Sequence, residues 1–311
     1  MRTVPIVFAF DNHLILPACV CISSLMMNAN EDTFYDIFIL HSEKVSLDCE
    51  KLDCIPFYYP QCRIQYRTVD DTFDKAFEIR GITTPAYYRL LIPELISEYD
   101  IILYSDVDVI FQSDLSDFYF NTDLQDNYVA GVNSLSHLVP EYNTYFRNMG
   151  RDAKCIIYSG NLLINSRKMK EDGLVQRFKE LSYNRFKFQD MDILNIACEG
   201  KIKYVNPDFC LTTIISQWAT YDRDKLREFW SDENINKALS KGIVHYNGQK
   251  PWRQYCINFD VWWEYYRKSP FFDEKYYFDF FYYRLNIFDQ LSLWKRIKIL
   301  IRYFIYGKRI I

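Results

Sequence analysis

The chain has 311 residues, of which 49% are hydrophobic and 25% charged, which is ordinary for a folded protein and excludes long disordered regions. The formal charge of −4 divides into −10 for residues 1–290 and +6 for residues 291–311. An acidic body is not typical of a nucleic-acid-binding protein, so we expect no nucleic-acid partner.

Cysteine usage and hydropathy indicate the cellular compartment. The nine cysteines are odd in number and form no C-x-x-C pair, which predicts neither a zinc site nor a disulfide framework and favours a reducing compartment. The first apolar run contains Pro5 and stops at Asp11, unlike a signal peptide. No stretch of 18 uncharged apolar residues is present, so we expect a cytoplasmic protein.

Strands and helices alternate along the first half of the chain. Short apolar runs predict strands at residues 5–10, 36–40, 64–69 and 99–104. Helical spacing of apolar residues, or a proline in the first turn, predicts helices at residues 17–28 and 85–95.

The second half continues this pattern. Strands are expected at residues 128–132, 161–165 and 242–246, and helices at residues 168–181 and 190–198. The alternation predicts an α/β sheet with helices on its faces, whose ligands would bind at the carboxyl ends of the strands. Composition changes after Pro251, which predicts a catalytic domain over residues 1–252 and a helical extension over residues 253–311.

Two aspartates follow the predicted strand that ends at Tyr104. Asp106 and Asp108 are two residues apart, so in an extended segment both carboxylates point the same way and could hold one divalent cation. The pattern D-x-D also occurs at positions 190/192 and 222/224, so its place after a strand is what distinguishes the first pair.

A histidine at the end of another predicted strand could complete this metal site. His245 precedes Asn247, Gly248 and Lys250, and the ammonium of Lys250 could bind a phosphate. A lone histidine is also commonly structural, and both readings stay open at this point.

Six blocks in one order resemble glycosyltransferase family 8, the retaining, metal-dependent transferases that include bacterial lipopolysaccharide galactosyl- and glucosyltransferases. The blocks span residues 6–13, 82–91, 103–109, 159–165, 189–195 and 245–252. The resemblance implies a GT-A type nucleotide-sugar-binding fold, a Rossmann-like mixed sheet flanked by helices.

The resemblance also implies functions for particular residues. It assigns Mn²⁺, with Mg²⁺ as an alternative, to Asp106, Asp108 and His245, and it implies Asp190 and Gln189 as catalytic residues. The residues implied to bind the UDP-sugar donor are Ala9, Asp11, Asn12, His13, Arg89, Asp106, Val107, Asp108, Gly160, Asn247, Gly248 and Lys250. Three positions depart from the family pattern: Tyr158 replaces a usual asparagine, Met191 a frequent glutamine, and Leu14 a frequent aromatic residue.

The tail over residues 291–311 interleaves aromatic and aliphatic residues with six basic ones and has no acidic residue. Such a segment predicts a basic amphipathic helix in peripheral contact with an anionic membrane surface, and the family resemblance implies that this surface is the inner face of the cell membrane. A helix packed on the protein's own body is the alternative.

The resemblance implies a retaining glycosyltransferase that moves galactose or glucose from UDP-galactose or UDP-glucose to lipopolysaccharide or another glycan or glycolipid acceptor. A non-catalytic sugar-nucleotide-binding module is an alternative because of Tyr158 and Met191. A nucleotidyltransferase is a weaker one, because no glycine-rich phosphate loop opens the chain.

Overall fold

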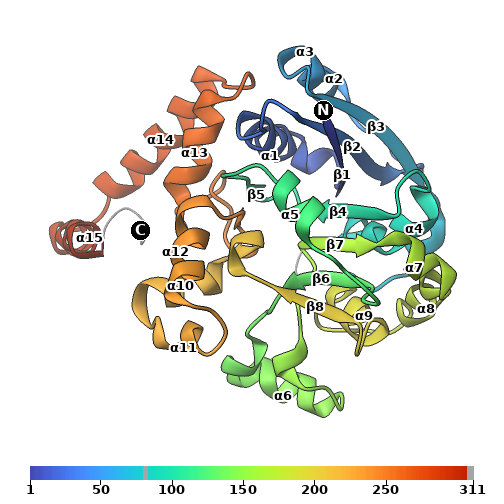
Figure 1. Ribbon diagram of the computed structural model, residues 1–311. Helices are drawn as coiled ribbons and strands as arrows, with labels where there is room; N and C mark the ends of the chain where they lie inside the picture. The colour runs from blue at the N-terminus through green and yellow to red at the C-terminus, as the bar shows by residue number, and fades with distance from the viewer. Residues whose placement is uncertain (80–82, 307–311) are drawn as a thin grey trace.

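A mixed sheet of seven strands forms the centre of the protein (Figure 1). The computed structural model describes residues 1–79 and 83–306, so Ile82 of the second sequence block and Lys308 and Arg309 of the tail lie outside the described residues. The strands, in spatial order, are β3 (Cys62–Val69), β2 (Thr33–Ser42), β1 (Arg2–Ala9), β4 (Ile101–Ser105), β7 (Asn161–Asn165), β6 (Val129–Val132) and β8 (Ile202–Val205).

The sheet brings the ends of β1 and β4 to one edge. These strands run parallel, with Ile6 beside Leu103, so the segments that follow them leave the sheet on the same side. Strand β7 is antiparallel to both β4 and β6, which makes the sheet mixed as predicted. Its first residue, Asn161, pairs with Ser105, the last residue of β4.

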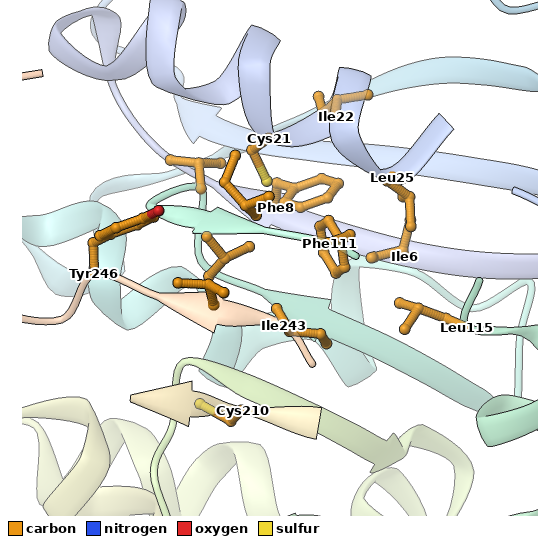
Figure 2. Close-up of a cluster of buried hydrophobic side chains, with 14 of the residues drawn as sticks. Ile6, Phe8, Cys21, Ile22, Leu25, Phe111, Leu115, Cys210, Ile243 and Tyr246 are labelled. Carbon is orange, nitrogen blue, oxygen red and sulfur yellow. The ribbon is translucent and has the colours of Figure 1, made fainter. Parts of the chain in front are cut away.

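Both faces of the sheet are buried, which explains the continuous apolar runs. Along β1, Ile6 and Phe8 point into one core and Val7 and Ala9 into the other, because successive side chains of a strand alternate. Figure 2 shows part of the first core, where Phe8 and Ile6 lie against residues of the first long helix.

The helices divide between the two cores. Those that bury side chains in the first are α1 (Ile15–Met27), α2 (Glu50–Asp53), α3 (Ile55–Tyr58), α10 (Thr213–Tyr221), α11 (Asp224–Arg227), α12 (Asp232–Lys241) and α13 (Phe259–Lys268). The second core receives the 3-10 helix η3 (Thr84–Leu91) and helices α4 (Ile92–Leu95), α7 (Ser166–Glu171), α8 (Leu174–Leu181) and α9 (Asp190–Ala197).

The remaining elements are peripheral or short. Helix α6 (Pro140–Asn148) packs in a small third cluster, and α5 (Ser116–Asn121) packs against the first core. The other short 3-10 turns are η1 (Asn12–Leu14), η2 (Asp71–Phe73), η4 (Ser136–Leu138), η5 (Ala153–Cys155) and η6 (Pro207–Phe209).

A second sheet of three very short strands lies beside the end of β4. Strand β10 (Val244–His245) is central, between β5 (Val109–Ile110) and β9 (Leu211–Thr212). It pairs antiparallel with β5 and parallel with β9. This small sheet joins three parts of the chain that are far apart in sequence.

Two predicted helices differ from the structure. The segment predicted as one helix over residues 168–181 is two helices, α7 and α8, because Gly173 between them has a left-handed backbone (φ +68°) that ends a helix. The helix predicted over residues 85–95 is mostly the 3-10 helix η3, and only α4 is α-helical. Pro93 has no amide hydrogen to continue the hydrogen-bond pattern of η3 across that junction.

The C-terminal helices form one side of the molecule (Figure 1). Helix α13 buries Trp262 and Trp263 in the first core, whereas α14 (Glu274–Asp289) has no buried residue. Helix α15 (Leu293–Tyr306) follows it and leaves Trp294 80% exposed. Among the described residues, no helix combines the length and the hydrophobicity needed to cross a membrane.

Candidate active site

The two strand ends and the small sheet bring Asp106, Asp108 and His245 together. Asp106 follows β4, Asp108 precedes β5, and His245 on β10 pairs with Val109. His245 Nε2 lies 3.2 Å from Asp108 Oδ1 and 3.6 Å from Asp106 Oδ2. One ligand atom from each residue lies within 4.8 Å of the others, so the three can hold one metal ion.

The chemistry and the shape of this cluster fit a divalent cation. Two carboxylates and an imidazole suit Mn²⁺ or Mg²⁺, which also bind phosphate oxygens. Gly160 lies against the cluster, and a Cβ at that position would come 2.8 Å from Asp106 Oδ2 and also collide with the His245 ring. The close packing therefore requires glycine at position 160, a position that the sequence predicted for the donor site.

Local electrostatics keep the Asp108 carboxylate ionised. Burial alone would raise the pKa of Asp108, but Lys250 and His245 hold it well below its usual range. Burial alone would lower the pKa of His245, but Asp108 and Cys210 raise it to about 10. The negative charge at this site thus attracts positive charge strongly.

Lys250 supplies one such positive charge. Its ammonium forms an ion pair with Asp108 Oδ2 and donates a hydrogen bond to the carbonyl oxygen of Tyr246 at 2.6 Å. His245 and Lys250 therefore approach different oxygens of the same carboxylate. A cation that took both oxygens of Asp108 would displace the ammonium.

Arg89 connects the metal cluster with Asp190. Its guanidinium donates to Asp106 Oδ1 at 2.8 Å and to the carbonyl oxygen of Ser159, and its Nε lies 3.3 Å from Asp190 Oδ2. Burial alone would lower the pKa of Arg89, but the carboxylates of Asp106 and Asp190 raise it above its usual value. Arg89 is 6% exposed, so it is an interior residue and not part of a surface ion pair.

Asp190 begins helix α9 and is almost completely buried. Burial raises the pKa of Asp190, while Arg89 and Ser159 act in the opposite direction. Among the described residues, Asp190 Oδ2 has no hydrogen-bond partner, and it lies 3.3 Å from Arg89 Nε. A partly satisfied carboxylate beside a buried arginine is typical of a functional site.

Gln189 precedes Asp190 in an unusual backbone conformation. Its φ of +48° and ψ of −117° are rarely adopted by residues other than glycine, and such strain clusters at functional sites. Its side chain donates to the carbonyl oxygen of Phe77 at 2.8 Å. The second aspartate of this pair, Asp192, accepts from Tyr145 Oη at 2.6 Å and from the Phe188 amide at 2.9 Å, so it connects the start of α9 to α6 and to the segment before the helix.

The polar residues after β1 lie at the same edge of the sheet as Asp106. Asp11 caps the turn η1 by accepting from the His13 amide at 2.9 Å. Asn12 exchanges hydrogen bonds with the backbone of Ser46 and Asp48, so its side chain fixes the neighbouring loop. Ala9 ends β1, and the His13 side chain is exposed.

The remaining predicted donor-site residues surround the cluster. Asn247 accepts from the Thr213 amide at 3.1 Å, and Val107 is buried between the two aspartates. A Cβ on Gly248 would meet only Thr213 Oγ1, at 3.8 Å, so packing alone does not require glycine there.

The three departures from the family pattern occupy distinct environments. Burial raises the pKa of Tyr158, while hydrogen bonds with Thr212 and Asn247 lower it, so its hydroxyl contacts the loop after His245. Met191 packs in the third cluster beside Phe146, and Leu14 packs against the first core.

Two neighbours of the cluster were not predicted as site residues. Tyr104 donates its hydroxyl to Asp106 Oδ1 at 2.8 Å, and Cys210 Sγ lies 3.4 Å from His245 Nδ1. The spacing of Tyr104, two residues before Asp106 in an extended segment, could have indicated that both share one side. Cys210 lies 35 residues from His245, so no local pattern reveals its position.

Comparisons with known proteins agree with this geometry. The sequence model of the family described as Glycosyl transferase family 8 matches residues 5–256. A Haemophilus influenzae protein named as a glycosyltransferase is 25% identical over 298 residues, which cover 87% of this chain and 85% of that protein. The glycosyltransferase GlyE of Streptococcus pneumoniae is 26% identical over 185 residues, 58% of this chain and 40% of GlyE.

Solved structures share the fold. The galactosyltransferase LgtC, in complex with donor and acceptor sugar analogs, superimposes with a TM-score of 0.71 at 23% identity over 88% of this chain and 99% of LgtC. The bifunctional WbbM structure gives a TM-score of 0.68 at 19% identity. Our chain covers 51% of the WbbM chain, about half its length. These neighbours identify the fold as GT-A type.

Proposed function

The chain belongs to glycosyl transferase family 8, and we propose that it transfers galactose or glucose from UDP-galactose or UDP-glucose to lipopolysaccharide or another surface glycan, with retention of configuration. The observation that carries the proposal is the connected cluster of Asp106, Asp108 and His245, joined to Asp190 through Arg89. The cluster places a candidate cation site close to a buried carboxylate. Transfer of a sugar from a diphosphate needs both, one to stabilise the leaving diphosphate and one to stabilise the sugar.

The cation site would act on the leaving group. Cleavage of the sugar–phosphate bond builds negative charge on UDP, and Mn²⁺ bound by Asp106, Asp108 and His245 would supply a Lewis acid for the diphosphate. Lys250 and Arg89 would add fixed positive charge beside it. Lys250 is placed for this because binding of a cation to Asp108 would release its ammonium towards the phosphates.

The carboxylate would act on the sugar. Positive charge develops at the anomeric carbon in the transition state, and a nearby carboxylate stabilises it. Asp190 is our candidate for this function, with Gln189 beside it. Arg89 would hold the Asp190 carboxylate in place through the 3.3 Å contact. Asp11, Asn12 and His13 would bind the nucleoside portion of the donor.

Helix α15 supports a peripheral membrane location at the cytoplasmic face. Lys295, Lys298 and Arg302 recur at helical spacing, and the apolar residues Leu293 and Phe304 are 71% and 80% exposed. An anionic membrane would bury the apolar side chains and attract the basic ones. The exposure of the apolar side chains argues against packing on the protein's own body.

Release of UDP from UDP-galactose and from UDP-glucose, each with Mn²⁺ and with EDTA, tests the proposal. We expect release from one donor, abolished by EDTA. Tight Mn²⁺-dependent UDP binding with no release from either donor, even with glycan acceptors present, would favour the non-catalytic binding module. Absence of UDP binding would contradict the donor assignment.

A further inference from the structure

The His245 ring is held on both of its nitrogen atoms. Nε2 faces the carboxylates of Asp106 and Asp108, and Nδ1 faces the sulfur of Cys210 at 3.4 Å. Gly160 packs against the same ring. Both Cys210 and His245 are buried, with 0% and 5% of their surfaces exposed.

The backbone fixes the sulfur relative to the ring. Cys210 immediately precedes β9, and its neighbour Leu211 pairs with Val244 on β10. The Leu211 amide donates to the Ile243 carbonyl oxygen at 2.8 Å, and the Cys210 carbonyl oxygen accepts from the Thr212 amide at 3.1 Å. Figure 2 labels Cys210 beside strand β9 and Ile243 beside strand β10.

The position of the hydrogen on the ring decides whether His245 can bind a metal ion. A neutral imidazole carries one hydrogen, and only the nitrogen without it has a free electron pair for a cation. If Nε2 is the metal ligand, the hydrogen must lie on Nδ1. Histidines that bind metals almost always donate this hydrogen to an acceptor, which fixes both the tautomer and the ring orientation.

We propose that Cys210 is a positioning residue for the metal site, whose sulfur accepts the Nδ1 hydrogen of His245 and directs Nε2 towards the cation. The inference rests on the proposed function, since it assumes that Asp106, Asp108 and His245 bind Mn²⁺. A thiol is a weaker acceptor than the carboxylate or carbonyl oxygen that usually has this function. We therefore expect that removing the Cys210 thiol weakens metal binding by an amount at the low end of the range seen when such hydrogen-bond acceptors are lost.

The test compares Mn²⁺ dissociation constants, measured from the electron paramagnetic resonance signal of free Mn²⁺, for the unsubstituted chain and three variants. Cys210→Ala removes the acceptor, and Cys210→Ser replaces it with a hydroxyl. Cys198→Ala is the matched control, because Cys198 is also fully buried but lies in the second core, away from the metal cluster. Thermal unfolding of each variant shows whether the fold is kept.

We expect Cys210→Ala to bind Mn²⁺ about tenfold more weakly, the low end of the range for lost partners of metal-binding histidines. Cys210→Ser should recover part of this loss, and Cys198→Ala should bind as the unsubstituted chain does. Unchanged affinity in Cys210→Ala, or equal losses in all three variants, would overturn the inference while leaving the metal site intact. Failure of the unsubstituted chain to bind Mn²⁺ would instead overturn the metal assignment of the proposed function, and this inference with it.

Discussion

The active-site edge and helix α15 differ in how far their side chains are covered by the rest of the protein. Trp262 and Trp263 on α13 are each 1% exposed, whereas Trp294 on α15, about thirty residues later, is 80% exposed. At the active-site edge, charged groups from distant segments neutralise one another inside the protein, as in the contacts of Arg89 with Asp106 and Asp190. Helix α15 instead leaves large apolar side chains such as Leu293 and Phe304 exposed.

This difference indicates what each region needs. In the proposed function a small cation completes the site, because the fold already holds the side chains of the site in place. In the proposed membrane contact, helix α15 would instead be covered by a large apolar and anionic surface, since single small ligands cannot cover a whole helix. Substitutions in one region should therefore leave the function of the other unchanged.

The largest expected effect is on turnover. Asp108→Asn keeps the shape of the side chain but removes one negative charge from the cation site, and we expect metal-dependent UDP release to fall about 10³-fold. Asp224→Asn is the matched control, because Asp224 belongs to another D-x-D pair and its side chain is 83% exposed. Near-normal turnover of Asp108→Asn would contradict the metal assignment.

Gly160→Ala tests the packing of the site without changing its charge. The added methyl group would collide with the His245 ring and approach Asp106, so we expect Mn²⁺ affinity to fall by about 10- to 100-fold, as for other disturbed metal sites. Calorimetric titration with Mn²⁺ measures this affinity. Gly131→Ala is the control, because its methyl group would press on Ile157 in the core instead. Equal Mn²⁺ affinities in both variants would show that the packing at Gly160 is unimportant.

The C-terminal helix is tested by removing two of its charges. Each basic residue near an anionic membrane contributes about 1 kcal/mol, so Lys295→Ala with Lys298→Ala should weaken binding to phosphatidylglycerol vesicles about 30-fold. Cosedimentation with vesicles measures the change, and UDP release without vesicles should stay unchanged. The control Tyr183→Ser removes an aromatic side chain that is 72% exposed elsewhere on the surface. Loss of binding in the control alone would place the membrane contact outside α15.

Tyr104→Phe should give the smallest effect. It removes one hydrogen bond to Asp106 Oδ1, which Arg89 continues to contact, and a hydrogen bond to a charged group is worth about 1.5–3 kcal/mol when lost. Because Arg89 remains, we expect a loss of about tenfold in Mn²⁺ affinity at most. A loss as large as that of Asp108→Asn would make Tyr104 an essential part of the site.

The sequence predicted every strand of the larger sheet except β8, because burial of both faces leaves apolar runs that can be recognised. The strand expected at residues 161–165 matches β7, and the run after Pro5 ends within a residue of β1. It did not predict β5, β9 and the parallel pairing of β9 with β10, since two-residue strands have no detectable periodicity.

Prediction of the candidate site from the sequence has the same limit, because contacts between distant segments leave no local pattern. Asp106, Asp108 and Asp190 stand in local motifs, and the structure brings their neighbours Arg89 and His245 to them. The contact of Cys210 with His245 exists only because β9 and β10 pair, so the sequence alone did not indicate it. Local motifs predicted the candidate ligand-binding residues, whereas the contacts between these residues and their neighbours follow from the fold.

The central claim is that Asp106, Asp108 and His245 bind one cation together with a nucleoside diphosphate. A crystal grown with Mn²⁺ and UDP, measured at the manganese absorption edge, tests it directly. We predict an anomalous-scattering peak in contact with all three side chains and with the diphosphate, and with Lys250 moved from Asp108 to the phosphates. A peak at any other position, or UDP bound with no peak between these residues, would contradict the account.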